Sequence, residues 1–468
     1  MITKFIKRIL RRDPMVKHTQ VSQSGAPKRI PKRVHRIDAH LLSKNAVKVT
    51  HTLQQAGFEA FIVGGAVRDL VLGIGPKDFD VATNATPDQV QRLFRKARLI
   101  GRRFQIVHVT FFGKGHPEII EVSTFRALLD NAGDHVAESG RILRDNVWGS
   151  QGEDAARRDF TINAMYYDPS SETVLDYHGG MVDMEKKTLR MIGDPAKRYR
   201  EDPIRMLRAI RFAAKTGFSL DPATRAPIAQ LTDLLHDVPS ARLFDEILKL
   251  LMSGYSWAAI QGLRNAGLHH GLLPLLDHIL DSGADSKGAN DFVKLALANT
   301  DQRIQSGKSV SAGFLFATLL WPDLLKNWKA NIAKGLSNIP ALHDAMDDTI
   351  ATQSSGMTIQ RRFESDMREI WSMQPRFEKR VGRYPYRLIE SPRFRAGYDF
   401  MLLRCATGEQ NPTIGEWWTD FIAADPTGQD TLMTSAKTEM GSSGVTSPAK
   451  RRRRRKPKSL TPPETSVT

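Results

Sequence analysis

The spacing of apolar residues divides the chain into a first part with mixed secondary structure and a second part that is helical. Short apolar runs bounded by Gly, Pro or Asp predict strands, and apolar positions three to four apart predict helices. In the first part these patterns predict a helix over 46–57 and strands over 61–63, 79–82, 106–112 and 118–125. Thr86-Pro87-Asp88 predicts the start of another helix. Roughly the first 165 residues therefore predict a small mixed α/β domain.

Beyond residue 161 the pattern is helical almost throughout. Polar residues and three prolines predict that 13–36 is a linker, and the loss of apolar residues after 424 predicts a disordered tail. Helical spacing covers 203–216, 240–252, 257–266, 291–304 and 309–320. We therefore expect five parts, which are a basic arm (1–36), a mixed α/β domain (37–168), a helical domain (169–260), a second helical domain (261–424) and a basic tail (425–468).

Length and composition are typical of a globular protein without disulfides. The chain has 468 residues, enough for two to four domains. Hydrophobic residues make up 41% and charged residues 25%, as in ordinary folded proteins. No apolar run reaches the length of about eighteen residues that a membrane span needs, so we expect no transmembrane helix. The single cysteine, Cys405, excludes an internal disulfide and a Cys-rich metal site.

The net charge of +17 resides in the two ends of the chain. Residues 1–36 hold eleven Lys or Arg and one acid, and residues 450–468 hold eight Lys or Arg and one acid, which leaves the residues between them neutral overall. Basic ends on a neutral folded part are typical of nucleic-acid binding, because Lys and Arg displace counterions from phosphates. Solubility is the alternative explanation.

The first twelve residues have the pattern of a basic amphipathic helix. Apolar residues lie on one helical stripe, with Lys and Arg around it. Such a helix suits a membrane surface. A transit peptide or an unstructured tail would have a similar composition, and the segment is too short to distinguish these alternatives.

Two carboxylates two positions apart are the strongest candidate for chemistry. On a strand, Asp78 and Asp80 would project from one face while Phe79 turned into the core. Adjacent carboxylates repel each other unless a cation lies between them, and their hard oxygens suit Mg²⁺. A turn or a solvated strand face would have the same spacing.

A glycine pair precedes these carboxylates. Gly64-Gly65 follows an apolar strand and opens a helix that carries Arg68. Backbone N–H groups in such a turn can approach a triphosphate, and Arg68 can pair with phosphate oxygens. A plain tight turn is the alternative.

Together these segments resemble a known family. Gly64-Gly65-Ala66-Val67-Arg68-Asp69, followed by Lys77-Asp78-Phe79-Asp80, resembles the catalytic head of the polymerase-β-type nucleotidyltransferases, in the branch that holds bacterial poly(A) polymerases and CCA-adding tRNA nucleotidyltransferases. Residues 157–164 and 201–208 resemble the family's ribose–phosphate and base-reading motifs, in the same order. The resemblance covers residues 45–260 and implies an α+β fold. That fold has a head of mixed sheet and helices, then all-helical neck, body and leg domains, with disordered basic termini.

The resemblance also implies a site for nucleotidyl transfer. Asp78 and Asp80 would hold two Mg²⁺ ions, one activating the RNA 3′-hydroxyl and one binding the triphosphate of ATP. Asp159 is the preferred third catalytic carboxylate by resemblance, and Glu121, an acid between apolar residues of a neighbouring strand, is its rival. The residues that match the family's nucleotide contacts are Gly64, Gly65, Arg68, Arg158, Asp202, Arg205 and Arg208.

Asp202 also has a purely structural interpretation. Asp at the N-cap before Pro203 is a common helix start. Arg205, Arg208 and Arg211 share one stripe of that helix, and the apolar residues between them form a second stripe that can pack inward. A capped helix with a solvated basic face would explain the pattern without a ligand. In the family, Asp202 and Arg205 would instead hydrogen-bond the incoming base, and their pattern suits adenine and cytosine equally.

Three features favour addition of A to RNA over addition of CCA to tRNA. Residues 99–104 and 391–400 resemble bacterial poly(A) polymerases, and the basic cluster 451–458 suits a sequence-blind grip on RNA. CCA addition is the alternative, and a non-catalytic RNA-binding protein on the same scaffold is the second. The expected partners are RNA 3′ ends, ATP and RNA-decay proteins. We expect a monomer in the bacterial cytoplasm, with peripheral contact to the inner membrane through residues 1–12.

Two further pairs have structural interpretations. Arg242 and Glu246 are four positions apart and predict an ion pair on one helix. Trp417-Trp418 predicts packing of the last helix, with a base-stacking platform as the alternative.

Overall fold

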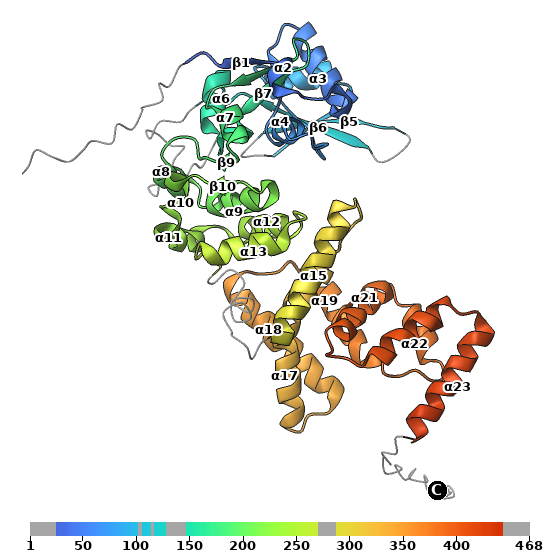
Figure 1. Cartoon of the computed structure of the whole chain (residues 1–468). Helices are drawn as coiled ribbons and strands as arrows, with labels where there is room; N and C mark the ends of the chain where they lie inside the picture. Colours follow the sequence, from blue (N-terminus) through green and yellow to red (C-terminus); the bar gives the residue numbers. More distant parts are fainter. Residues whose placement is uncertain (1–24, 102–104, 114–116, 128–146, 270–286, 443–468) are drawn as a thin grey trace, which may run out of the picture. The chain divides into compact units, whose positions relative to one another are not determined.

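The computed structural model describes residues 25–101, 105–113, 117–127, 147–269 and 287–442 (Figure 1). Compactness divides the chain into two units, unit 1 (1–364) and unit 2 (365–468). The predicted amphipathic segment 1–12 and the basic cluster 451–458 lie outside the described residues. Among the residues that are described, no helix has both the length and the apolar character of a membrane span.

Unit 1 begins with an eight-stranded mixed sheet whose strand order is β1-β8-β7-β2-β3-β6-β5-β4. Neighbouring strands are antiparallel except for β3 and β6, which are parallel. The sheet confirms the four predicted strands and the mixed α/β head. The strands are β1 (Lys28–Pro31), β2 (Ala60–Val63), β3 (Asp80–Thr83), β4 (Ala97–Ile100), β5 (Ile106–Phe111), β6 (Glu118–Thr124), β7 (Met165–Asp168) and β8 (Thr173–Asp176).

Helices cover this sheet from both sides. On one side α3 packs against β2, β3 and β6. Helix α5 begins where the sequence predicts, because Thr86 caps it through a reciprocal capping box with Gln89. On the other side Ala155 of α6 joins a core formed with Val63, Ala82, Phe125, Tyr166 and Leu175. Asp80 lies two residues before Ala82, so it is on this second face, at the end of the apolar core. The helices of the head are α2 (Lys32–His35), α3 (Lys44–Gln55), α4 (Gly65–Val71), α5 (Pro87–Leu93), α6 (Gln151–Arg157) and α7 (Gly180–Glu185), with 3₁₀ turns η1 (Ala39–Leu41) and η2 (Thr161–Asn163).

Two local predictions about the head were wrong. Residues Lys28–Pro31 are not linker, because they pair with β8 as an edge strand, where the proline at the end of the strand costs no ladder bond. The segment after 161 is not helical throughout, since β7 and β8 complete the sheet and β9 (Thr188–Leu189) pairs with β10 (Ser219–Leu220). Strand pairs between segments that are remote in sequence override weak local patterns. The sheet therefore extends beyond the expected boundaries 37–168 at both ends.

Apart from the β9–β10 pair, the secondary structure described in the rest of unit 1 is helical, and all five predicted helices are present. Helix α9 buries Ile204, Leu207 and Ile210 against α12 and α13, which confirms the predicted inward stripe. Gly262 of α13 allows the close approach, because a Cβ there would lie 2.7 Å from a methyl carbon of Ile210. The helices are α8 (Pro195–Glu201), α9 (Ile204–Thr216), α10 (Pro222–Arg225), α11 (Ile228–Leu231), α12 (Ser240–Leu251), α13 (Ser256–Asn265), α15 (Lys287–Gln305), α16 (Ala312–Leu319), α17 (Trp321–Ala333) and α18 (Asn338–Gly356), with the 3₁₀ turn η3 (Thr232–Asp237).

Unit 2 has its own aromatic core. Trp417 and Trp418 are 7% and 0% exposed and pack with Phe377 and Phe421, so their predicted packing role is confirmed. The tail is helical up to Ser442, contrary to the prediction of disorder from 425, because Ala436 is buried and the Leu432 carbonyl accepts a hydrogen bond from the Trp417 indole. Its elements are the end of α19 (Arg361–Met373), η5 (Gln374–Arg376), α20 (Tyr384–Ile389), α21 (Phe394–Ala406), α22 (Pro412–Ala423) and α23 (Pro426–Ser442).

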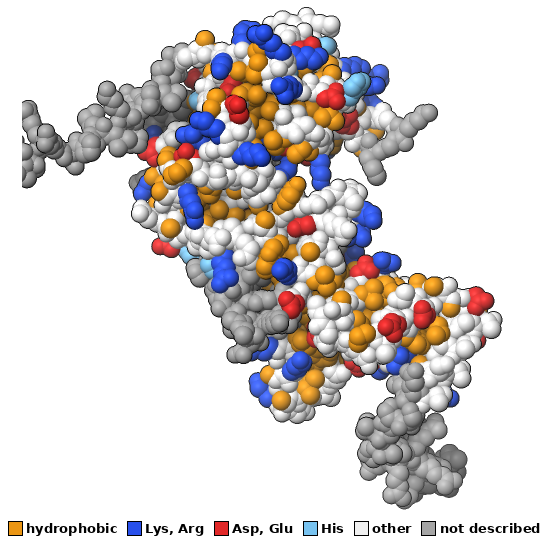
Figure 2. Space-filling model, in the orientation of Figure 1, with side chains coloured by type: hydrophobic (Ala, Val, Ile, Leu, Met, Phe, Trp, Pro, Cys, Tyr) orange, Lys and Arg blue, Asp and Glu red, His pale blue; other side chains and the backbone are white. Residues whose placement is uncertain are grey.

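The α+β class predicted from the sequence is confirmed, with a mixed sheet before a helical region. The division into two units falls at 364/365, inside the expected second helical domain 261–424, and the expected domain boundaries stay predictions. On the face that Figure 2 shows, Lys and Arg side chains occur alongside acidic ones over the described parts. This mixture agrees with the neutral overall charge of the chain between its basic ends.

Candidate active site

A glycine turn forms one wall of the site. Strand β2 ends at Val63, and Gly64 follows with φ 71° and ψ −134°, a backbone conformation that is essentially restricted to glycine. A Cβ at Gly64 would lie 3.4 Å from Nη1 of Arg158 and 3.8 Å from Oδ2 of Asp80. The backbone of the turn is therefore in close contact with a guanidinium and a carboxylate from two other segments.

The two predicted carboxylates flank a buried ring. Phe79 is 6% exposed, whereas Asp78 is exposed and Asp80 is partly buried. The alternation agrees with the prediction, but the placement of Asp78 on a strand was wrong, because β3 begins only at Asp80. The reason lies in the neighbouring strand, since β2 ends at Val63, the partner of Asp80.

Asp80 lies in a negative environment. Burial and the nearby carboxylates of Glu121 and Asp78 raise the pKa of Asp80 to about 6, against the opposing effect of Arg158. Glu121 is the register partner of Asp80 across the parallel β3–β6 pair, and its side chain is 50% exposed and 3.3 Å from Nε2 of His108. Crowded carboxylate oxygens of this kind fit a divalent cation such as Mg²⁺. Within the described residues, no three acidic, His or Cys side chains are already gathered as a ligand set.

Arg158 is fixed beside Asp80 by its own partners. Its guanidinium donates to Asp154 (3.0 Å) and to the hydroxyl of Tyr166 (3.1 Å). The guanidinium of Arg198 donates to the backbone carbonyls of Arg157 and Arg158, which fixes the turn. A rigid cation beside the glycine turn is chemically suited to phosphate oxygens, and the contact of Arg158 with phosphate stays a prediction.

Asp159 lies in a different network from Asp80. It is 9% exposed and accepts hydrogen bonds from the Phe160 N–H, the Asn163 amide and the Arg208 guanidinium. Burial alone would raise the pKa of Asp159, but Arg208 and these hydrogen bonds lower it to about 2. Glu121, the rival for the third carboxylate, is the one that the sheet register places beside Asp80.

Arg68 belongs to the same buried network as Asp159. It is 2% exposed and donates to Asp69 (2.8 Å) and to Asn163 (2.7 Å). Asp69 also accepts from Lys215 of α9 (2.9 Å). The chain of contacts from Asp69 to Arg208 thus joins the head to α9, and a phosphate could reach Arg68 only after rearrangement.

The predicted base-reading residues lie at the α8–α9 junction. Helix α9 begins at Ile204 and no side chain caps it, so the N-cap prediction for Asp202 was wrong. Its carboxylate instead accepts from Arg242 (3.1 Å). Arg205 donates to Glu201 (3.1 Å) and to the Arg198 carbonyl (2.8 Å).

The predicted Arg242–Glu246 pair is also absent, because both residues have other partners. Arg242 pairs with Asp202, and Glu246 accepts from Arg211 at 2.6 Å. Two charges that are suitably spaced along one helix therefore bind charges on other elements.

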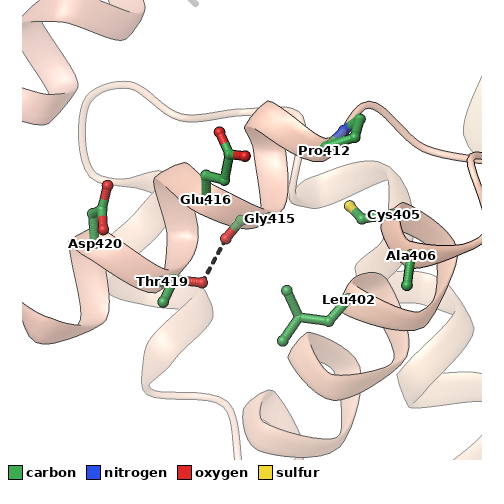
Figure 3. Close-up of a pocket in the computed structure, with 8 residues that line it drawn as sticks. All are labelled: Leu402, Cys405, Ala406, Pro412, Gly415, Glu416, Thr419 and Asp420. Carbon is green, nitrogen blue, oxygen red and sulfur yellow. Dashed lines mark hydrogen bonds between the residues drawn. The ribbon is translucent and has the colours of Figure 1, made fainter.

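The structure brings Gly64, Asp80 and Arg158 together, with Glu121 beside them, and groups Arg68, Asp159 and Arg208 in the buried network. Asp154, Asn163 and Arg198 position these groups and were not predicted. Of these three residues, only Asp154 could have been predicted from the sequence, because its position four residues before Arg158 is the spacing of an ion pair along a helix. A pocket in unit 2 between α21 and α22, which includes Cys405 and Asp420, contains none of the predicted site residues (Figure 3).

Comparison with known proteins identifies the family of the chain. Residues 60–190 match the model of the Poly A polymerase head domain, residues 217–280 a probable RNA and SrmB-binding site of polymerase A, and residues 334–458 the polymerase A arginine-rich C-terminus. Poly(A) polymerase I of Salmonella typhimurium is 43% identical over 92% of both chains. The chain belongs to the poly(A) polymerase family.

Other members of the family are similar along the whole length. Poly(A) polymerase I of Escherichia coli O6:H1 is 41% identical over 98% of both chains. The CCA-adding enzyme of Bacillus pumilus is 38% identical, but over only 51% of this chain and 57% of its own. The solved CCA-adding enzyme of Bacillus stearothermophilus in complex with CTP has a TM-score of 0.54 at 24% identity and covers 85% of this chain and 92% of its own, which shows a shared fold.

Proposed function

We propose that this chain is a polynucleotide adenylyltransferase that adds AMP from ATP to RNA 3′ ends and so promotes RNA turnover. The observation that carries the proposal is the partly buried Asp80, whose pKa is raised by Glu121 and Asp78 and which lies beside Gly64 and Arg158. Similarity to poly(A) polymerase I over 92–98% of the chain, against 48–61% of the chain for three CCA-adding enzymes, favours addition of A.

The reaction is an in-line displacement at phosphorus. The 3′-hydroxyl oxygen of the RNA attacks the α-phosphorus of ATP, a new phosphodiester bond forms, and the bond to the bridging α–β oxygen breaks as pyrophosphate leaves. Two Mg²⁺ ions held by Asp78 and Asp80, with Glu121 as the third carboxylate, would acidify the hydroxyl and offset phosphate charge. Arg158, fixed by Asp154 and Tyr166, stabilises the negative charge that develops on the leaving group.

Base selection belongs to the α8–α9 junction. Asp202 and Arg205 supply an acceptor and donors for the base edge, and their pairs with Arg242 and Glu201 fix their orientation. Arg208 acts on the nucleotide through Asp159, which it holds ionised.

The decisive experiment offers ATP, CTP or both, with Mg²⁺, to an unstructured RNA and to tRNA lacking its terminal nucleotides. We expect long A-only tails on the unstructured RNA. Addition of C confined to tRNA would replace the proposal with CCA addition. RNA binding without any transfer would make the chain a non-catalytic binder.

The proposal extends to where the chain acts. We propose a monomer in the bacterial cytoplasm that binds RNA-decay proteins and contacts the inner membrane through residues 1–12. Flotation of the full chain with anionic vesicles, compared with a variant lacking 1–12, tests the membrane contact. Equal flotation of the two proteins would contradict it.

A further inference from the structure

Exposed basic and aromatic side chains gather around the start of α20 in unit 2. Arg376, Lys379, Arg383 and Arg387 are all exposed, and Tyr384 is 56% exposed. Cations interleaved with an open aromatic ring are the usual composition of a surface that binds single-stranded nucleic acid.

Helix α20 buries two of its residues and leaves its first residue and the neighbouring arginines exposed. Pro385 and Leu388 are buried in the core of unit 2, where Leu388 packs near Phe377. Arg383 and Arg387 are four residues apart and both exposed, so they share one open face. Tyr384 is 56% exposed because it is the first residue of the helix, although it lies four residues before the buried Leu388. We name Lys379, Arg383, Tyr384 and Arg387 the Tyr384 surface.

The ring of Tyr384 is already set against a cation. Nζ of Lys379 lies 5.2 Å from the ring centroid. Among the described residues the Tyr384 hydroxyl has no hydrogen-bond partner, so the contact of the ring is with the Lys379 ammonium group and not through its polar end. The exposed ring keeps apolar surface in contact with water, which is unfavourable, and a base stacked on the ring would cover that surface.

The positive charge of this surface is not neutralised within unit 2. Arg383 and Arg387 have no ion-pair partner in the part of the chain that the structure describes. By contrast, Arg393 pairs with Asp366 and Arg395 pairs with Asp399. Unpaired guanidinium groups that flank an open ring suit phosphates on either side of a stacked base.

We propose that the Tyr384 surface binds single-stranded RNA, with one base stacked on Tyr384 and the neighbouring phosphates on Lys379, Arg383 and Arg387. The inference rests on the proposed function, which supplies the single-stranded substrate. The tryptophans Trp417 and Trp418, the base-stacking alternative raised by the sequence, are buried and cannot serve. The surface holds RNA without reading its sequence, because every base has a stacking face.

The test measures affinity of the full chain for fluorescent oligo(A), without ATP or metal, so that binding is read whether or not AMP is transferred. Tyr384→Ala is expected to weaken binding about 5- to 150-fold, because base stacking contributes about 1–3 kcal/mol. Tyr384→Phe is the matched control and is expected to bind as the wild type does. Tyr384 is exposed, so both variants should keep the wild-type melting temperature.

The salt dependence of RNA affinity distinguishes the contribution of the Tyr384 ring from that of the charged side chains. The loss in Tyr384→Ala is expected to be the same factor at about 50 and about 200 mM salt, since stacking releases no counterions. The double variant Arg383→Gln/Arg387→Gln is expected to reduce the slope of log affinity against log salt by about 1.4, as each phosphate contact contributes about 0.7 for single strands.

Three results would overturn the inference. They are unchanged oligo(A) affinity in Tyr384→Ala, equal weakening in Tyr384→Phe, and competition by duplex RNA or an acidic peptide as effective as that by oligo(A). In transfer assays, Tyr384→Ala should raise KM for RNA and leave kcat unchanged. Loss of transfer by the wild type would contradict the proposed function but not this inference.

Discussion

At the scale of single residues, Asp80 combines a chemical role with a structural cost. Burial, Glu121 and Asp78 raise the pKa of its carboxyl to about 6, compared with about 4 in an unfolded chain. The protonated form is therefore favoured by folding, and the stability that it contributes is lost as the pH rises through about 6. A cation bound there would reverse this, because it favours the ionised form.

Replacing Asp80 with Asn should abolish transfer and stabilise the metal-free fold. We expect the free energy of unfolding of Asp80→Asn in EDTA to exceed that of the wild type by on the order of 1–3 kcal/mol at pH 7. The gain should vanish near pH 2, well below the unfolded pKa of about 4, where Asp80 is protonated in both states. Denaturant unfolding at the two pH values measures the difference, and retained transfer in Asp80→Asn or Asp78→Ala would contradict the assignment.

Glu121 and Asp159 should differ in what their loss changes. Glu121→Gln is expected to lower kcat at least about 100-fold with little effect on stability, since its side chain is half exposed and its charge acts at Asp80. Asp159→Asn should instead lower the free energy of unfolding by about 1–3 kcal/mol, because Arg208 loses its buried partner.

The pH dependence distinguishes the two roles further. The pKa of Asp159 is lowered to about 2, so the stability from its charge is present above about pH 4 and is lost as the pH falls through 2. The deficit of Asp159→Asn should therefore disappear in strong acid. If Glu121→Gln keeps full activity and Asp159→Asn loses kcat with an unchanged fold, the roles are reversed.

At the scale of elements, the turn between β2 and α4 places a backbone segment against the site. Gly64 has φ 71°, and a Cβ there would face Arg158 and Asp80. Gly73, after the same helix, has the same φ but open space around its Cα, which makes it a matched comparison.

Both glycines should tolerate alanine poorly, but only one should affect catalysis. Gly64→Ala and Gly73→Ala are each expected to lower the free energy of unfolding by about 1–3 kcal/mol through backbone strain. Gly64→Ala should also lower kcat at least about tenfold, because the Cβ displaces Arg158 or the phosphates. Measurement of kcat and thermal stability for both tests this, and equal loss of kcat would argue against a special position of Gly64.

At the scale of the whole molecule, two units with separate cores should unfold separately. Phe125 is fully buried in the head and Trp418 in unit 2. Truncation of a fully buried aromatic ring costs about 3–5 kcal/mol. Cores that share few contacts need not unfold as one cooperative transition.

We therefore expect two calorimetric transitions. Trp418→Ala should lower the midpoint of one, and Phe125→Ala should lower the midpoint of the other. Trp418→Ala should also weaken oligo(A) binding, because the Tyr384 surface is built on the core that Trp418 fills. A single transition shifted by both substitutions would show that the chain unfolds as one body.

The sequence by itself determined most elements and the identity of the chemical groups. Short apolar runs, the Thr86 cap and the spacing along α9 are local features, and local patterns set local structure. The joint occurrence of Gly64-Gly65 and the two aspartates was interpreted through its resemblance to the motifs of a known family.

Only the tertiary structure decided which of these groups meet. Parallel pairing of β3 with β6 places Glu121 beside Asp80, and contact with α9 draws Asp159 to Arg208. The sequence also did not predict that β1 pairs with β8, or that Arg242 pairs with Asp202 and Glu246 with Arg211. The reason is physical, because register and ion pairing between remote segments depend on how whole elements pack, and no periodicity within one segment encodes its partner.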